Sequence, residues 1–262
     1  MRKFFTKNKY WLITIASALI LFGVWELIAR VMNLAIALPT FSSVFLAFIN
    51  LIIKSSTYVS IAFTLLRCLI GYIIGFSLGI ALGIVAGKYK AVASAMKPIV
   101  SSMRAVPVVA ITLVLTIWVG SEILPSIIGV MLIFPIIYEQ IKTATENIDP
   151  TIDDVLSELG VGFFTSARQI YLPLVAPYAL SSISNTFGMN IKAVISAEVL
   201  AYTVRSIGSE IYFSKQNFLQ ETPTLFAWIT ITILLSVIFE TLLRFIMKKV
   251  ISKLTWFSAM KN

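Results

Sequence analysis

The sequence has no histidine and only one cysteine, Cys68, among its 262 residues. Without histidine, a serine or cysteine nucleophile has no imidazole base, and the common histidine-containing zinc motifs cannot form. A lone cysteine cannot make an internal disulfide or a paired redox motif. Cys68 lies in an apolar run, where it is interpreted as a small packing residue. We therefore expect the chain to hold no catalytic residue and no metal ion.

Charge is also scarce, since only 13% of the residues are charged and 58% are hydrophobic. The mean hydropathy is +0.93. A soluble core of this size could not enclose so much apolar surface, so the composition predicts a membrane protein in contact with lipid. The net charge of +9 would suggest nucleic acid in a soluble protein. In a membrane protein, basic residues gather in cytoplasmic loops instead, and no nucleic acid is expected.

Long apolar segments predict an all-α polytopic fold with about six transmembrane helices in a single domain of residues 1–262. The expected spans are 11–28, 58–86, 99–119, 125–138, 174–199 and 225–247. This arrangement puts most lysines and arginines on one side, which places both termini in the cytoplasm. A cleavable signal peptide is the alternative for the first segment, because Ala35-Ile36-Ala37 resembles a cleavage site. Against it, the apolar run is long enough to span and charges precede the small residues.

Five glycines recur every four residues in the second segment, at Gly71, Gly75, Gly79, Gly83 and Gly87. In lipid, a row of small residues lets another helix approach closely. We interpret the row as a helix-packing ridge, with compositional bias as the alternative.

Residues 149–173 form the long polar passage in the apolar second half of the chain. Pro150 suits a first helical turn, and Asp149 or Thr151 can cap its free N–H groups. Gly160 and Gly162 would end this helix. A second short helix, at about 163–170, would end before Leu172-Pro173. The pattern predicts a helix-turn-helix on the membrane surface.

Gly160 is followed after nine residues by Ile170 and then by Leu172-Pro173. This spacing resembles the cytoplasmic signature of permease subunits of ATP-binding-cassette (ABC) importers, written Glu-Ala-Ala, three residues, Gly, nine residues, Ile-x-Leu-Pro. The opening triplet departs from it, because Asp154-Val155-Leu156 stands there. Further likeness to the nitrate/sulfonate/taurine-type branch covers roughly residues 38–200, at Leu38-Pro39-Thr40, Leu66-Arg67 with Gly71, Gly83 to Gly87, Pro98, Arg104 to Pro107, Trp118 to Gly120 and Ala197-Glu198.

The resemblance implies a type I ABC importer permease fold in the plasma (inner) membrane of a prokaryote. It implies that residues 149–173 form the coupling helix, which docks in a groove of the ATPase. The expected docking residues are Asp154, Glu158, Gly160, Arg168, Ile170, Leu172 and Pro173.

The implied partners are two ATP-binding-cassette ATPase subunits, an extracytoplasmic solute-binding protein and a second permease copy packed in part through glycine-bearing faces. The chain would need no cofactor, because ATP and Mg would be bound by the partner ATPase. Gly87-Lys88 lacks the pattern of a phosphate-binding loop. The mechanism would be alternating access.

Three basic residues lie within expected spans, namely Arg67, Arg104 and Lys192. An ionised group there must be paired, reach an interface or face water. Arg104 is close enough to the inner end to reach the interface. Arg67 and Lys192 are instead candidates for one water-accessible vestibule.

The fifth expected span carries a polar stripe that supports a pathway. Helical geometry places the following residues within roughly 80° of each other: Ser181, Asn185, Gly188, Lys192 and Ser196. Glu198 lies off the stripe, where it either lines the pathway or neutralises Arg67 or Lys192. The candidate pathway residues are therefore Arg67, Ser181, Asn185, Lys192 and Glu198.

The basic groups favour a small anionic solute such as a sulfonate or nitrate, while a heterocyclic vitamin precursor is the alternative. An autonomous channel or secondary carrier is a second hypothesis, although no filter sequence or paired half-helix repeat is visible. An intramembrane enzyme is a third, although the sequence has no Gly-x-Gly-Asp pattern.

Overall fold

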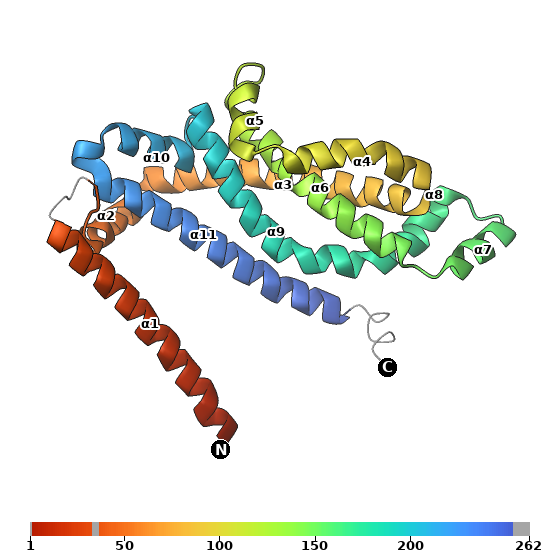
Figure 1. The fold of residues 1–262 in the computed structure, drawn as a ribbon, viewed down its shortest axis with the longest axis horizontal. Coiled ribbons are helices and arrows are strands. Elements are labelled where there is room, and N and C mark those ends of the chain that lie inside the picture. Colours follow the sequence, from red (N-terminus) through yellow and green to blue (C-terminus); the bar gives the residue numbers. More distant parts are fainter. Residues whose placement is uncertain (1, 33–36, 254–262) are drawn as a thin grey trace. The chain divides into compact units, whose positions relative to one another are not determined.

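The computed structural model describes residues 2–32 and 37–253, and the regular structure within these ranges is helical throughout (Figure 1). The expected all-α class is confirmed. The chain divides into two compact units. The first unit joins residues 1–58 to 210–231, and the second joins 59–209 to 232–262. Part of the signal-peptide alternative, at residues 33–36, lies outside the described residues.

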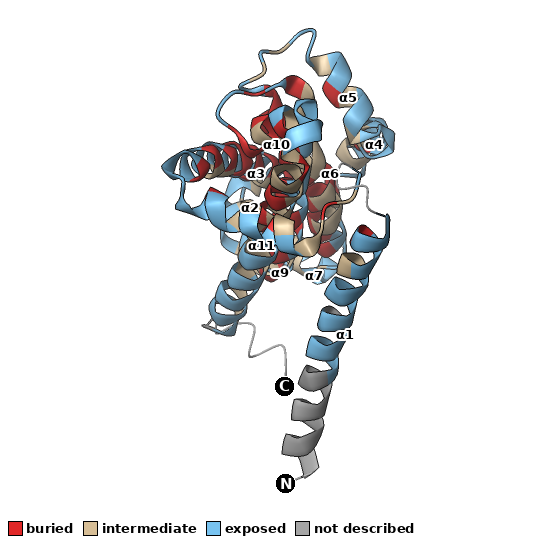
Figure 2. Ribbon diagram, turned by 90° about the vertical axis from the view of Figure 1, so that its left-hand side faces the viewer, coloured by how far each residue is buried: buried red, intermediate tan, exposed pale blue. Residues whose placement is uncertain are grey.

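The first unit contains α1 (Arg2–Met32) and α2 (Phe41–Ile53). Thr40 begins α2, because its hydroxyl oxygen accepts a hydrogen bond from the backbone N–H of Ser43 at 3.3 Å. The indole N–H of Trp25 in α1 donates to the carbonyl oxygen of Pro39 at 3.1 Å. The Trp25 ring also packs edge-on against Phe41. These contacts join the end of α1 to the start of α2, whereas Figure 2 shows most described side chains of α1 exposed.

The remaining helices are α3 to α11. Their bounds are α3 (Ser55–Lys88), α4 (Lys90–Ala105), α5 (Val108–Leu115), α6 (Leu124–Glu146), α7 (Pro150–Glu158), α8 (Phe163–Ser166), the π-helical η1 (Ala167–Tyr171), α9 (Leu172–Ala201), α10 (Ile207–Gln216) and α11 (Phe218–Lys253). Within the second unit, α6 is the most buried of the long helices, with Ile133, Ile137 and Ile141 fully buried. Its packing against α3 and α9 forms the core.

The five glycines of α3 lie directly against α6. A Cβ atom on Gly79 would lie 2.7 Å from the Cβ atom of Ile137, and one on Gly87 would lie 2.4 Å from that of Thr145. Both distances are shorter than the 3.0 Å that real Cβ contacts respect. Gly71, Gly75 and Gly83 face α6 in the same way. The row therefore packs α3 closely against α6 within the chain, and the packing of two permease copies through glycine-bearing faces stays a prediction.

Polar side chains add hydrogen bonds among α3, α6 and α9. The hydroxyl of Ser126 in α6 donates to the carbonyl oxygen of Arg67 at 3.1 Å. The amide nitrogen of Asn190 in α9 donates to the carbonyl oxygen of Cys68 at 2.9 Å. Because both acceptors are backbone atoms of α3, the three helices have a fixed register along each other.

The expected third span, at 99–119, is wrong as a single straight helix. It is broken into α4 and α5, whose axes meet at 96°. Pro107 explains the break, since it has no backbone N–H and it disfavours helical torsions at Val106. Val106 accordingly has φ −74° and ψ 125°. Two further differences are that α6 extends past Tyr138 to Glu146, and that the expected outer loop contains α10.

Four described helices are long and apolar enough to cross a membrane, and the bent pair α4 and α5 would make five. The four are 13–32, 55–88, 124–146 and 218–252. Although α9 has 30 residues, it is not among them, because serine, asparagine and lysine residues interrupt its apolar sequence. The count of six spans stays a prediction.

Candidate docking loop and translocation path

Residues 149–173, here called the docking loop, begin with a capped helix. The Asp149 carboxylate accepts from the backbone N–H of Thr151 at 2.9 Å and from its hydroxyl at 2.8 Å. These two hydrogen bonds stabilise the ionised form and lower the pKa of Asp149 below its ordinary value. Gly160 follows the end of α7 with φ +63°, a torsion that glycine adopts without strain.

The second half of the docking loop differs from the prediction. A short helix was expected to end before Leu172-Pro173, but α8, η1 and α9 run on as one helical path. The backbone N–H of Leu172 donates to the carbonyl oxygen of Ala167, which makes a π turn. The expected end was wrong because Pro173 lies in the first turn of α9, where a missing N–H costs little.

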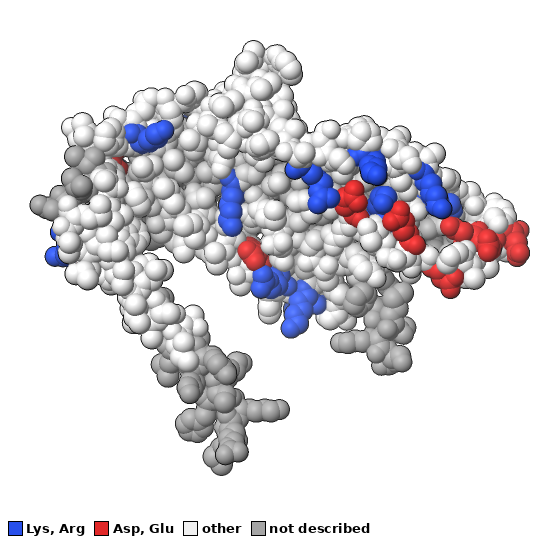
Figure 3. Space-filling model, viewed as in Figure 1, with Lys and Arg blue, Asp and Glu red and all other residues white. Residues whose placement is uncertain are grey.

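The docking loop presents apolar side chains to solvent beside unpaired charges. Val155 is 52% exposed, Leu159 72% and Phe164 81%, whereas Leu156 is buried. Figure 3 shows acidic atoms gathered at the α7 end of the molecule. Of the predicted docking residues, Asp154, Glu158, Gly160, Arg168 and Leu172 are exposed, while Ile170 and Pro173 are half-buried. None of the ion pairs between described residues involves Asp154, Glu158 or Arg168.

A polar contact that the sequence did not reveal ties the docking loop to α3. The ammonium of Lys88, at the end of α3, lies 3.1 Å from the Asp153 carboxylate and 3.2 Å from the Tyr171 hydroxyl. The Tyr171 hydroxyl donates to the same carboxylate. The ammonium also lies 5.0 Å from the centre of the Tyr171 ring. These contacts connect α7 and the end of η1 to the end of α3.

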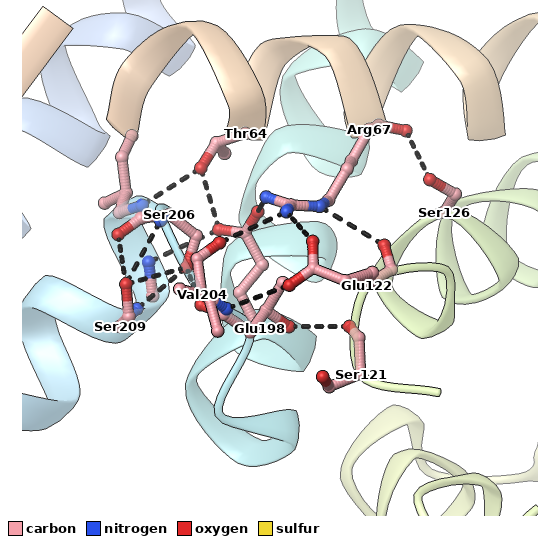
Figure 4. Close-up of polar contacts among 12 residues, drawn as sticks. Thr64, Arg67, Ser121, Glu122, Ser126, Glu198, Val204, Ser206 and Ser209 are labelled. Carbon is pink, nitrogen blue, oxygen red and sulfur yellow. Dashed lines mark hydrogen bonds and ion pairs between the residues drawn. The ribbon is translucent and has the colours of Figure 1, made fainter. Parts of the chain in front are cut away.

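In the first half of α3, Arg67 is buried and lies in a polar cluster (Figure 4), of which Glu122 and Val204 are exposed. Its guanidinium donates to a Glu198 carboxylate oxygen at 3.2 Å and to the Glu122 carboxylate. It also donates to the carbonyl oxygens of Glu122 and Val204, each at 3.2 Å. We call Thr64, Arg67, Glu122, Glu198 and Val204 the Arg67 cluster. It joins α3, the start of α6, the end of α9 and the loop before α10.

Glu198 is fully enclosed in the Arg67 cluster, with an exposed fraction of 0%. Besides Arg67, it accepts from the Thr64 hydroxyl at 2.9 Å and from the backbone N–H of Gly208 at 3.3 Å. A Cβ atom on Gly208 would lie 2.3 Å from the Cβ atom of Glu198, so the start of α10 packs directly against α9 at Glu198. The structure thus pairs Arg67 with Glu198 inside the chain, the neutralising alternative that the sequence left open.

The polar stripe of α9 is largely exposed. Ser181, Asn185, Lys192 and Ser196 are exposed, while Gly188 is buried. A Cβ atom on Gly188 would lie 3.4 Å from a Glu240 carboxylate oxygen. Lys192 is not among the hydrogen-bonding partners of the Arg67 cluster, and it forms no ion pair with a described residue. The sequence grouped Arg67 and Lys192 in one vestibule, but the structure pairs only the first of them with Glu198.

Comparison with known proteins identifies the family of this chain. The family of binding-protein-dependent transport system inner membrane components matches residues 79–252. The chain belongs to this family. This inner-membrane transport component is therefore a permease and not an enzyme. Over 248 residues it is 23% identical to SsuC of Bacillus subtilis (strain 168), a protein named for aliphatic sulfonates transport, with 94% of this chain and 88% of the relative covered.

Solved structures show the same fold. This permease superposes with a TM-score of 0.63 and 15% identity on a chain of a bacterial ABC transporter involved in the import of the acidic polysaccharide alginate, covering 93% of this chain and 97% of that one. It superposes with a TM-score of 0.53 and 15% identity on a chain of the inward-facing MetNI methionine ABC transporter. The match covers 75% of this chain and 93% of that one. The ABC importer permease fold that the resemblance implied is confirmed.

Proposed function

We propose that this permease forms the translocation path of an ATP-driven importer for a small anionic solute such as a sulfonate or nitrate. Two copies enclose the path, and two separate ATPase subunits bind ATP and Mg. A solute-binding protein delivers the solute from outside, and both termini lie in the cytoplasm. Transport follows alternating access, in which closure of the ATPases moves the docking loops together.

The docking loop carries the proposal of an ATPase partner. A free surface that exposes Val155, Leu159 and Phe164 is unfavourable in water. The exposed acidic groups of α7 beside them add negative charge to this surface. It suits a groove with apolar walls and a basic rim, because an amphipathic helix can bury one face there. The contact of Lys88 with Asp153 and Tyr171 then passes the movement to α3.

The α9 stripe supports a water-filled path. Lipid would leave the Asn185 amide and the Lys192 ammonium without partners, so this face must meet water or another protein surface. An unpaired ammonium attracts anions, which agrees with the sulfonate named for the similar permease from Bacillus subtilis. Lys192 is thus the residue that would pair with the negative charge of the proposed substrate.

The test is to co-express this permease with the ATPase and solute-binding protein encoded beside it, and to reconstitute the complex in nanodiscs. ATPase activity is measured while sulfonates, nitrate and heterocyclic compounds are screened with the binding protein. We expect one class of small anion to raise the ATPase rate by roughly fivefold or more. Stimulation only by a neutral heterocycle would reject the anionic substrate. Solute flux through the permease alone would reject ATP-driven import in favour of a channel or carrier.

A further inference from the structure

A second polar stripe runs along α4, outside the predicted pathway residues. Its exposed members are Ser94, Lys97, Ser101 and Arg104, and their spacing places them within roughly 80° around the helix. Ile99, the large apolar residue that α4 exposes, lies on the opposite side of the helix. Lipid tails would leave these hydroxyl and ammonium groups unsatisfied, so this face of α4 meets water.

The stripe leads into a cavity between α4 and α6. The cavity has a volume of 330 Å³ and is lined by Ala93, Ser94, Lys97, Tyr138, Glu139 and Lys142. Figure 3 shows basic and acidic atoms together over this part of the molecule. The volume suits a small solute rather than a macromolecular segment.

Tyr138, which lines this cavity, has a buried hydroxyl without a hydrogen-bond partner among the described residues. The residue is 1% exposed, and its ring packs with Phe134, Ala86 and Val100. Leaving a buried hydroxyl unpaired is costly, so an acceptor in the cavity would satisfy it.

The charged residues around the cavity differ in whether they form ion pairs. Lys142 is already paired with Glu146 at 3.1 Å, while Lys97 and Glu139 form no ion pair with described residues. An oxyanion can accept from the Lys97 ammonium and the Tyr138 hydroxyl together. The Glu139 carboxylate repels the same group, which keeps the affinity low. A site on a conducting path requires such weak binding, because the solute must also leave.

We propose that this cavity is a weak transit site for the oxyanion group of the solute, on the cytoplasmic side of the path. Lys97 and Tyr138 hold the oxyanion, and Glu139 limits how long it stays. The inference rests on the proposed function for the direction of the path, since α4 begins beside Lys88 and the docking loop. The α4 stripe then continues from the cavity to Arg104, where α4 breaks and a second cavity of 210 Å³ is lined by Met103, Arg104 and Val106.

The experiment measures binding of radiolabelled sulfate, with methanesulfonate as competitor, to the permease–ATPase complex in phosphatidylcholine nanodiscs at constant ionic strength. Tyr138→Phe and Lys97→Met should each weaken binding by about tenfold. Glu139→Gln should tighten it severalfold, an opposite effect that general damage would not produce. Tyr178→Phe is the matched control, because Tyr178 is exposed on α9 and does not line the cavity.

Absence of saturable sulfate binding, unchanged binding by Tyr138→Phe, or weaker binding by Glu139→Gln would each overturn the transit site. A lipid phosphate offers the same oxyanion chemistry, so the measurement is repeated in phosphatidylglycerol nanodiscs. Loss of sulfate binding there would assign the cavity to a lipid headgroup and would also overturn the proposal. If the sulfate pattern holds but no anion drives ATP hydrolysis, the proposed substrate fails while the site stands. If anion-driven transport works and all four variants behave alike, the site alone fails.

Discussion

The Arg67 cluster and the docking loop lie at opposite ends of the same stretch of α3. They differ in whether their charged side chains form ion pairs within the chain. In the cluster, the Arg67 guanidinium is surrounded by two carboxylates and two carbonyl oxygens, and Glu198 is fully buried. In the docking loop, Asp154, Glu158 and Arg168 are exposed and unpaired within the described chain. The first region satisfies its polar groups internally, and the second offers them to another molecule.

This difference separates residues that hold the permease together from residues that serve transport. A buried charge that loses its partner is strongly destabilising, whereas an exposed charge can be changed at little cost to folding. Substitutions in the two regions should therefore affect different measurements.

Arg67→Met should have the largest effect. It leaves Glu198 buried without its cation, which costs about 3–5 kcal/mol. We expect the purified protein to lose its monodisperse peak in size-exclusion chromatography and most of its thermal stability. Glu198→Gln added to Arg67→Met should recover part of the stability, because the buried charge is then removed. A stable Arg67→Met protein would show that the cluster is not structural.

Gly79→Leu should rank next, because its side chain must displace Ile137 or separate α3 from α6. Overpacking of this kind costs about 1–3 kcal/mol, and more where backbone must move. The thermal midpoint of the detergent-purified permease measures it. Gly23→Leu is the matched control, since no atom lies within 4 Å of a Cβ atom at helical Gly23. Equal losses from both variants would contradict the assigned role of the row.

Gly160→Pro should leave folding intact but uncouple ATP hydrolysis from uptake. Proline cannot adopt the φ of +63° at Gly160, so the end of α7 must change. Gly162→Pro is the control, because Gly162 already has φ −64°. The ratio of solute transported to ATP hydrolysed should fall by about tenfold in Gly160→Pro and stay near the parent value in Gly162→Pro.

Asp154→Lys tests the charge of the same surface and should lower the ratio of transport to hydrolysis less than Gly160→Pro does. The exposed carboxylate can be reversed without disturbing the packing of α7. Binding of the ATPase, measured by co-purification at low and high salt, should weaken mainly at low salt. Unchanged coupling and co-purification would place the ATPase elsewhere.

Lys192→Met should have the smallest effect on assembly and a selective effect on transport. The side chain is exposed and has no ion pair with a described residue. We expect an unchanged thermal midpoint and a rise of roughly threefold to tenfold in the solute concentration that gives half-maximal uptake. An unchanged concentration dependence would remove Lys192 from the path.

Local sequence signals predicted the features that depend on neighbouring residues. The four-residue spacing of the glycines identified a close-packing ridge, and Pro150 after Asp149 identified a capped helix. The break at Pro107 was missed because an apolar sequence outweighed one proline. The continuation through Pro173 was missed because the π turn before it was not considered.

Contacts between distant residues could not be read in this way. Lys88 and Asp153 are 65 positions apart, and Thr64 and Glu198 are 134 apart. Nothing in either segment specifies the other, because the pairing follows from how α3, α6 and α9 pack. The α4 stripe differs, since its spacing was visible in the sequence. Of its members, Arg104 alone carries a sequence-based prediction, namely that it reaches the membrane interface.

The absence of α3 side chains along the glycine row has a mechanical consequence. The side chains of Ile137, Ile141 and Thr145 in α6 rest directly on the α3 backbone, so the two helices resist sliding past each other and behave as one stiff unit. Lys88 and Arg67 connect α3 to the docking loop and to the Arg67 cluster at two points about 30 Å apart along the helix. In the proposed transport cycle, a displacement of the docking loop would therefore move α3 and α6 together as one body.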